Sequence, residues 1–284
     1  MTPKVAAKVK DDLIGTGIFL ERDTYQLFKD WKADRVFTAY REYPYSYGIH
    51  PRIIDGTIDV LAATGIDYGD IVLILPTECK KADPLLKHWV FEPHRPAGIR
   101  DMPYFMFTQG GENSFTQGYN LPNLGYNAYG DYENCVNSFE FSEDKGALYR
   151  GSDKRLRPYF AIKQANEAVP GIIEKIPSLS RQLAARNFVI PIVVTTANLW
   201  ITRYDPQDIS KATGEIDTAK LDLVQKDWLL YHYPVALQEQ TSGSLVGSPA
   251  NGIIRPDKRP TFVVNSVKLP DFVTNLIHDL EGYF

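Results

Sequence analysis

The stretch Ile71–Lys80 (IVLILPTECK) says most about the fold of this chain. Its first half is a continuous apolar run, which is typical of a strand that is buried on both faces of a sheet. Glu78 and Lys80 stand two residues apart at its end, so their side chains share one face and Cys79 points to the opposite layer. The stretch therefore predicts a central strand with a carboxylate and an amine at its carboxyl end.

A second strand is predicted just upstream, over residues 56–63, and it carries Asp59. If the two strands are neighbours and Asp59 lies across from Glu78, two carboxylates with Lys80 at their edge form a small oxygen-lined site. Hard divalent cations prefer oxygen ligands, and such a cation can activate a water molecule. We therefore expect a metal site between the two strands.

The pattern of Asp59 followed by Glu78-Cys79-Lys80 resembles the D…(D/E)xK signature of the restriction-endonuclease-like, or PD-(D/E)xK, nuclease superfamily. The strand around Asp59 (IDVLA) and the strand that ends in ECKK also resemble the family's two strands, and the resemblance covers residues 14–95. Two positions depart from the pattern. Ile58 stands where the family often has proline, and Pro76 removes a strand donor, which predicts a bend or an edge.

The resemblance implies a role for each residue of the signature. Asp59, Glu78 and Lys80 would be the catalytic residues. Asp59, Glu78 and the main-chain carbonyl of Cys79 would hold Mg²⁺ or Mn²⁺. Lys80 would orient the attacking water or help to deprotonate it, and would stabilise the developing negative charge.

Three further residues are weaker candidates. Glu21 lies on the first predicted helix, where many members of the superfamily place a further acid that faces the metals, but a solvated helix position is the favoured interpretation. Lys81 is a candidate for contact with a phosphate. Gln164 resembles a helix residue that some branches place near the site, although an exposed polar position is an equally good interpretation.

A plainer interpretation of the whole signature also stays open. Asp59 would then be a solvated residue at a strand end. Glu78 and Lys80 would form a surface ion pair that contributes less than about 1 kcal/mol.

The expected elements begin with helix, strand, strand, strand, which is the order in which the core of the superfamily begins. Helices are expected over residues 13–31, 159–174 with a kink near Pro170, 178–187 and 270–280. Strands are expected over residues 36–40, 56–63, 71–80, 188–195 paired with 198–204, 228–235 and 261–267, with a turn at 43–48 and a loop at 238–260. We therefore expect an α/β (α+β) fold with a mixed central sheet flanked by helices, as one restriction-endonuclease-like domain over residues 1–284.

Residues 96–158 differ from the rest of the chain, because they are rich in tyrosine, phenylalanine, glycine and asparagine without clear periodicity. Such a segment predicts an irregular insertion. Its rings either pack against one another or form a surface on which unpaired bases stack, and the sequence leaves both open.

The composition describes an ordinary globular protein, with 44% hydrophobic and 23% charged residues among 284. A formal net charge of −4 counts mildly against tight non-specific DNA binding and leaves room for a local basic patch. The two cysteines, Cys79 and Cys135, give neither a disulfide framework nor a zinc site. Since no apolar run resembles a membrane span or a signal peptide, we expect a cytoplasmic protein with no membrane partner.

The resemblance implies a Mg²⁺-dependent endonuclease that hydrolyses phosphodiester bonds of nucleic acid, with DNA as the expected substrate, in a setting of restriction or antiviral defence. A homodimer would supply the two sites needed to cut both strands of a duplex. One alternative is a non-catalytic nucleic-acid-binding or assembly subunit with the same fold. Another is an α/β protein that binds a small ligand beneath its aromatic segment. The intact set of Asp59, Glu78 and Lys80 favours the enzyme.

Overall fold

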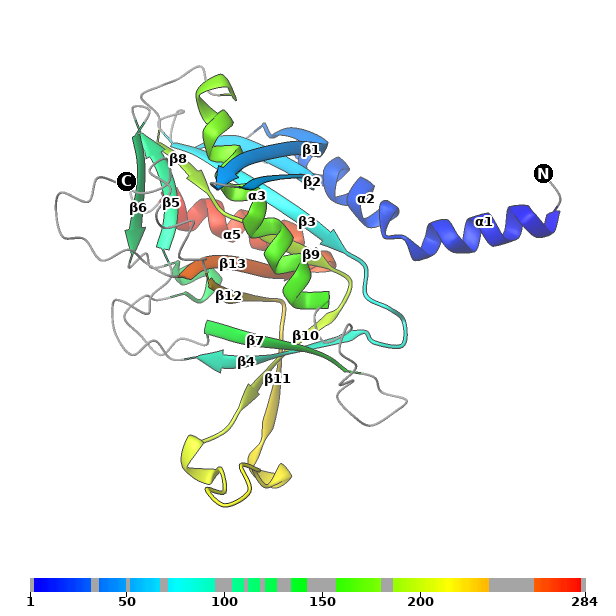
Figure 1. Ribbon diagram of the computed structural model, residues 1–284, viewed down its shortest axis with the longest axis vertical. Helices are drawn as coiled ribbons and strands as arrows, with labels where there is room; N and C mark the ends of the chain where they lie inside the picture. Colours follow the sequence, from blue (N-terminus) through cyan, green and yellow to red (C-terminus); the bar gives the residue numbers. More distant parts are fainter. Residues whose placement is uncertain are drawn as a thin grey trace.

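A mixed sheet of 13 strands forms the centre of the fold (Figure 1). The computed structural model describes residues 3–31, 36–49, 52–66, 71–94, 104–109, 112–117, 121–126, 134–141, 157–179, 186–234 and 258–281. The strands are β1 (Thr38–Ile49), β2 (Arg52–Ile66), β3 (Ile71–Lys80), β4 (His88–His94), β5 (Tyr104–Gln109), β6 (Glu112–Gln117), β7 (Asn134–Phe141), β8 (Arg186–Val189), β9 (Ile192–Thr195), β10 (Asn198–Arg203), β11 (Asp222–Lys226), β12 (Trp228–Pro234) and β13 (Lys258–Asn265). Their order is β11-β10-β4-β7-β12-β13-β9-β3-β8-β5-β6, and β2 joins β3 and carries β1. The α+β class with a mixed sheet and few helices is as predicted.

Helices cover both faces of this sheet. These are α2 (Ile18–Lys29), α3 (Arg157–Leu179) and α5 (Leu269–Glu281), whereas α1 (Pro3–Gly15) extends away from the sheet (Figure 1). In Figure 1, α3 crosses the front of the sheet and α5 lies behind it. Neighbouring residues of β9 show why both faces are apolar: Val193 packs in a cluster with α3, whereas Val194 packs in a cluster with α5 and α2. The apolar run of β3 is buried for the same reason, as its sequence indicates.

β3 lies inside the sheet, so the edge position that Pro76 suggested is wrong. β3 is parallel to β8 over Ile71–Ile74 and parallel to β9 over Thr77–Lys80. Pro76 falls between these two ladders. On the neighbouring side, β8 and β9 are separated by residues 190–191, which include Pro191. The missing donor of Pro76 therefore coincides with a break in the neighbouring strand.

β1 and β2 form a long antiparallel ribbon, which the sequence prediction underestimated. Pairing runs from Thr38–Ala63 to Ile49–Arg52, so the turn expected at residues 43–48 is wrong and these residues are strand. Tyr45 and Tyr47 point into a core cluster with α3. Apolar contact with α3 is thus what extends the strand beyond its predicted end at residue 40.

The predicted helix over residues 13–31 is two helices. Gly17 has a φ of 85°, in the left-handed region that glycine adopts without penalty, and it separates α1 from α2. The helix predicted at residues 159–174 continues through Pro170 to Leu179, because its buried face packs on β1, β2 and β3. The helix expected at 178–187 lies largely outside the described residues, and its described ends belong to α3 and β8.

Residues 96–158, expected as an irregular insertion, contribute strands at two places. β5 and β6 form an antiparallel hairpin at one edge, whereas β7 lies inside the sheet between β4 and β12. The predicted pairing of residues 188–195 with 198–204 is also wrong, since β9 lies between β3 and β13 and β10 lies between β4 and β11. No helix in the described part of the chain is long and apolar enough to cross a membrane.

The close packing of α3 on β1 gives a test of this fold. A Cβ atom added at Gly171 would lie 3.0 Å from both the backbone nitrogen of Ser46 and the Cβ of Tyr45. We expect Gly171→Ala to lower the free energy of unfolding by about 1–3 kcal/mol in urea denaturation.

Gly48→Ala is the matched control, because a Cβ there meets nothing within 4 Å. It should change the free energy of unfolding by no more than about 0.5 kcal/mol. Equal effects at the two positions would contradict the close approach of α3 to β1.

Candidate active site at the fork between two strands

The candidate site lies where β2 separates from β3. The last pair of the antiparallel β2–β3 ladder is Val60 with Thr77. The next residues, Asp59 and Glu78, therefore stand across from each other at the point where β2 continues with β1 alone. The two strands are antiparallel neighbours, as the sequence predicted.

The two faces of the β1–β2 ribbon exchange sides of the sheet at this fork. Ile58 packs in the cluster beneath α3, whereas Val60 packs in the cluster beneath α5 and α2, although residues two apart on a regular strand share a face. The change of face falls at Asp59. Across from it on β1, Glu42 has a φ of 48°, and a left-handed conformation is uncommon for a residue other than glycine.

Asp59 replaces the hydrogen bond that the fork removes from β3. The backbone N–H of Cys79 donates to Oδ2 of Asp59 over 2.7 Å. In a continuing ladder, this donor would meet a carbonyl of β2. The carboxylate is thus fixed between the strands, and its second oxygen takes no part in this bond.

Glu78 and Lys80 point to the α3 side of the sheet. Nζ of Lys80 lies 3.5 Å from Oε1 of Glu78 and donates to Oε1 of Gln164 on α3, also over 3.5 Å. The side chain of Glu78 is only 4% exposed and that of Lys80 is 35% exposed. Glu78 is therefore the buried member of the pair, and Lys80 leads from it to the surface.

The carboxylates of the fork lack sufficient compensating positive charge. Burial, followed by the charge of Asp59, raises the pKa of Glu78 to about 8 even though Lys80 lowers it. Burial also raises the pKa of Asp59, against the effects of the Cys79 hydrogen bond and of Lys80. A nearby cation would favour the ionised form of both groups.

Glu21 faces the same region from α2. Burial and the charge of Asp59 raise its pKa, and an ion pair with Arg41, at 3.8 Å, opposes this shift. Within the described ranges, however, no three His, Cys, Asp or Glu side chains lie close enough together to hold a metal ion. Glu21 thus does not join Asp59 and Glu78 in a three-carboxylate group.

The remaining predicted residues hold α1 and α2 against β3. The thiol of Cys79 is buried on the opposite side of the strand from Glu78, as expected, and forms a side-chain hydrogen bond with Thr24 of α2. Nζ of Lys81 donates to the carbonyl oxygen of Ile14 at the end of α1. In this structure, Lys81 therefore contacts the end of α1, and its contact with a phosphate stays a prediction.

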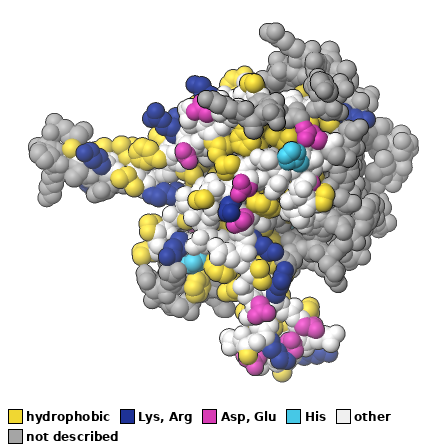
Figure 2. All heavy atoms as spheres, turned by 180° about the vertical axis from the view of Figure 1, so that it is seen from behind, with side chains coloured by type: hydrophobic (Ala, Val, Ile, Leu, Met, Phe, Trp, Pro, Cys, Tyr) yellow, Lys and Arg dark blue, Asp and Glu magenta, His cyan; other side chains and the backbone are white. Residues whose placement is uncertain are grey.

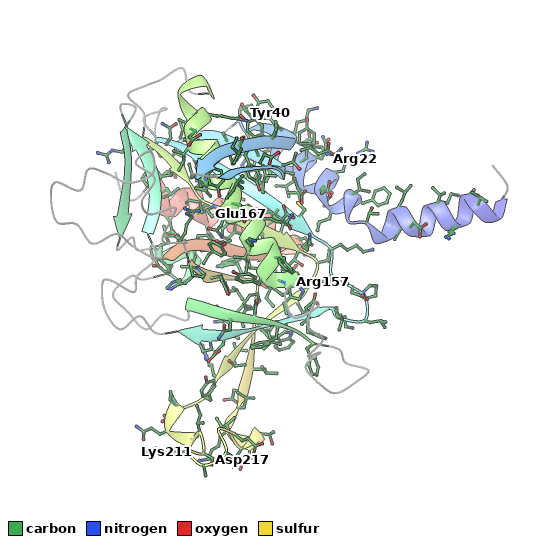
Figure 3. The ribbon with its side chains drawn as sticks, in the orientation of Figure 1. Arg22, Tyr40, Arg157, Glu167, Lys211 and Asp217 are labelled. Carbon is green, nitrogen blue, oxygen red and sulfur yellow. The ribbon has the colours of Figure 1, made fainter. Side chains whose placement is uncertain are left out.

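Sequence reasoning missed the contribution of β1 to the site. Arg41 pairs with Glu21, and Glu42 raises the pKa of Asp59. Burial and the charges of Glu167 and Glu78 raise the pKa of Tyr45 to about 12. Figure 3 shows Glu167 on α3. The alternation of tyrosines at positions 43, 45 and 47 was the signal that could have extended the strand past these residues.

A large pocket lies apart from the carboxylates. Its volume is about 1310 Å³, and residues 122–126 line it together with Trp228 and the start of the β10–β11 arm, which consists of β10, β11 and residues 204–221 between them. Several of its polar groups are already hydrogen-bonded, such as the Trp228 indole N–H, which donates to the Leu124 carbonyl.

Tyr126, from the aromatic segment at residues 96–158, is buried rather than exposed for base stacking. Among the other aromatic residues of this segment, the structure describes the side chains of Phe139 and Phe141 of β7, which are half-buried; the predicted stacking surface otherwise lies outside the described side chains.

The raised pKa of Glu78 predicts how stability depends on pH. The folded protein holds a proton on Glu78 up to about pH 8, whereas the unfolded chain releases it near the ordinary value of 4.5. The contribution of this group to stability is therefore full below pH 4.5 and is lost as the pH rises through 8. Without added metal, Glu78→Gln should raise the free energy of unfolding relative to wild type by more at pH 8 than at pH 5, by at least about 1 kcal/mol.

Glu174→Gln, at an exposed position of α3, is the matched control for this measurement. Its effect in urea denaturation should be small and similar at both pH values. A difference for Glu78→Gln that does not grow with pH would contradict the uncompensated burial of this carboxylate.

No protein-family model, no curated protein and no solved structure matches this chain. The function is therefore inferred from the geometry of the chain's own residues.

Proposed function

We propose that this chain is a metal-dependent nuclease with a restriction-endonuclease-like core, which hydrolyses phosphodiester bonds of nucleic acid, with DNA as the expected substrate. One observation carries the proposal: Asp59 of β2 lies at the same fork between adjacent strands as Glu78 and Lys80 of β3, although it precedes them by about twenty residues. The order α2, β1, β2, β3 before the site and α3 beside it supports the proposed core.

The donor set fits a hard divalent cation. Mg²⁺ is commonly held by one or two carboxylates, with water and phosphate oxygens completing its shell. Asp59 and Glu78 supply two carboxylates, and burial makes their negative charges costly without a cation. The residues that would hold Mg²⁺ or Mn²⁺ are Asp59, Glu78 and the carbonyl of Cys79. The bound ion would polarise a phosphate and lower the pKa of a bound water.

The other groups act by position and charge. Asp59 fixes Cys79 through its hydrogen bond, so the backbone at the site stays in place. Lys80, held between Glu78 and Gln164, places an ammonium where a phosphate at the fork would gain negative charge. Such a group stabilises that charge and can orient a water molecule or accept its proton after losing its own. Gln164 positions Lys80. Its side chain is also exposed, so it can contact substrate directly.

With Mg²⁺ or Mn²⁺ the protein should cleave DNA, and Ca²⁺ should bind yet support much less cleavage, because it acidifies water less. Asp59→Asn keeps an acceptor for the Cys79 N–H and removes the charge, so it should lose both metal binding and cleavage. Lys80→Ala should retain Mn²⁺ binding in calorimetry but slow cleavage by about 10²–10⁴-fold.

Lys211→Ala is the control for the loss of a lysine, because Figure 3 places Lys211 on the arm beyond β10, away from α3. It should cleave at the wild-type rate. If Asp59→Asn is folded and cleaves as fast as wild type, the activity lies elsewhere. A folded wild type that binds no Mn²⁺ and cuts no nucleic acid would instead favour the non-catalytic binding subunit.

A further inference from the structure

Phe160 is an exposed aromatic residue on α3, one turn from the residue that holds Lys80. It is 44% exposed, and Gln164, four positions later, accepts a hydrogen bond from Nζ of Lys80. Side chains four positions apart lie on the same face of a helix, about 5–6 Å from each other. Phe160 therefore continues, by one turn, the face of α3 that contacts the candidate site.

That face of α3 is covered at one end and open at the other. At the covered end, Gly171 packs against β1, and a Cβ atom added to it would lie 3.0 Å from the backbone nitrogen of Ser46. Glu167, one turn earlier, is half-buried, whereas Gln164 and Phe160 are exposed. The helix thus emerges from under the β1–β2 ribbon toward its N-terminal end, and Phe160 lies on the open part, next to the candidate site.

Two basic side chains flank Phe160. Arg157 lies three positions before it and Lys163 three positions after it, and residues three positions apart are neighbours on a helix surface. The side chains of Arg157 and Lys163 are 35% and 41% exposed. Figure 3 shows Arg157 at the N-terminal end of α3. This part of α3 therefore presents an aromatic ring between two cations.

Both cations keep donors for a further anion. Arg157 lies 3.7 Å from Asp83 and 4.0 Å from Glu140, and Lys163 lies 3.4 Å from Glu167. These distances exceed the roughly 2.7–2.9 Å of a charge-assisted hydrogen bond. A guanidinium and an ammonium each carry several N–H donors, so a phosphate can bind without displacing the carboxylates.

An aromatic ring between cations is an arrangement with which proteins bind a single strand of nucleic acid. Bases stack on an aromatic ring with little dependence on sequence, while basic groups follow the backbone. In a duplex, the neighbours of each base cover both of its faces, so no face is free for Phe160. A base can therefore stack on this ring only where its strand is unpaired.

We propose that Phe160 stacks on an unpaired base beside the scissile phosphate, with Arg157 and Lys163 at the adjoining phosphates, so that the chain prefers single-stranded nucleic acid. The role of Phe160 rests on the proposed nuclease function, because Lys80 and Gln164 mark where the scissile phosphate would lie. Helix α3 then selects the form of the substrate in addition to positioning Lys80.

Binding in Ca²⁺, which should support little cleavage, tests the stacking directly. At one fixed salt concentration, fluorescence anisotropy should show that a labelled single strand of DNA binds the full chain more tightly than the same sequence in a duplex. Phe160→Ala should weaken binding of the single strand by about 5–100-fold and binding of the duplex much less. Phe160→Trp keeps a stacking ring and should bind like wild type, whereas Phe160→Leu, which is apolar without a ring, should resemble Phe160→Ala.

Leu223→Ala is the control for the loss of an exposed apolar side chain. Leu223 is 53% exposed and lies on β11, an edge strand far from β3 in the strand order. Figure 2 shows acidic and basic side chains mixed on the β10–β11 arm, at the bottom of that view, so its visible face is not uniformly basic. Leu223→Ala should bind both forms of DNA like wild type, and thermal denaturation would verify that each variant is folded.

Cleavage in Mg²⁺ separates the role of Phe160 from the proposed function. Wild type should cut single-stranded DNA faster than duplex, and Phe160→Ala should slow cleavage of the single strand much more than that of the duplex. A wild type that prefers the duplex, or a Phe160→Ala protein that binds and cuts both forms like wild type, would overturn the stacking role and leave the nuclease proposal standing. A folded protein that neither binds nor cuts nucleic acid would overturn both.

Discussion

The separation of β2 from β3 at Asp59 is the constraint on which the site depends. A strand that leaves its neighbour abandons backbone donors, and an unpaired buried donor is costly. Here the Asp59 carboxylate accepts the N–H of Cys79 in place of a β2 carbonyl. This one bond closes the fork and fixes a carboxylate beside Glu78. The same turn of the ribbon brings Arg41 and Glu42 of β1 to the site.

The fork also concentrates negative charge where little water can reach it. Glu78 is nearly buried, and Lys80 alone does not offset burial and the charge of Asp59, so the pKa of Glu78 stays near 8. A site that is costly in the absence of a cation is well prepared to bind one, because the cation relieves the repulsion as it binds. The burial that lowers stability at this point of the fold is thus what the proposed cation would offset.

The sequence allowed the core of this arrangement to be predicted, because its signals are local. The apolar run of β3 and the spacing of Glu78 and Lys80 indicated a buried strand with both side chains on one face. The α+β class and the antiparallel pairing of β2 with β3 followed from the same stretch. By contrast, the extension of β1 through Tyr45 depends on packing against α3, and its local signal was only the alternation of tyrosines at positions 43, 45 and 47. Glycine and proline signals were similarly overruled in α3, which continues through the buried Pro170.

The most direct test of the central claim is a crystal structure of the protein grown with Mn²⁺, with anomalous diffraction recorded to locate the ion. The account predicts an anomalous peak at the fork, with an oxygen of Asp59, an oxygen of Glu78 and the carbonyl oxygen of Cys79 as ligands at about 2.0–2.2 Å. At pH 8 and saturating Mn²⁺, a fork without a peak, with Glu78 still paired to Lys80 alone, would contradict it.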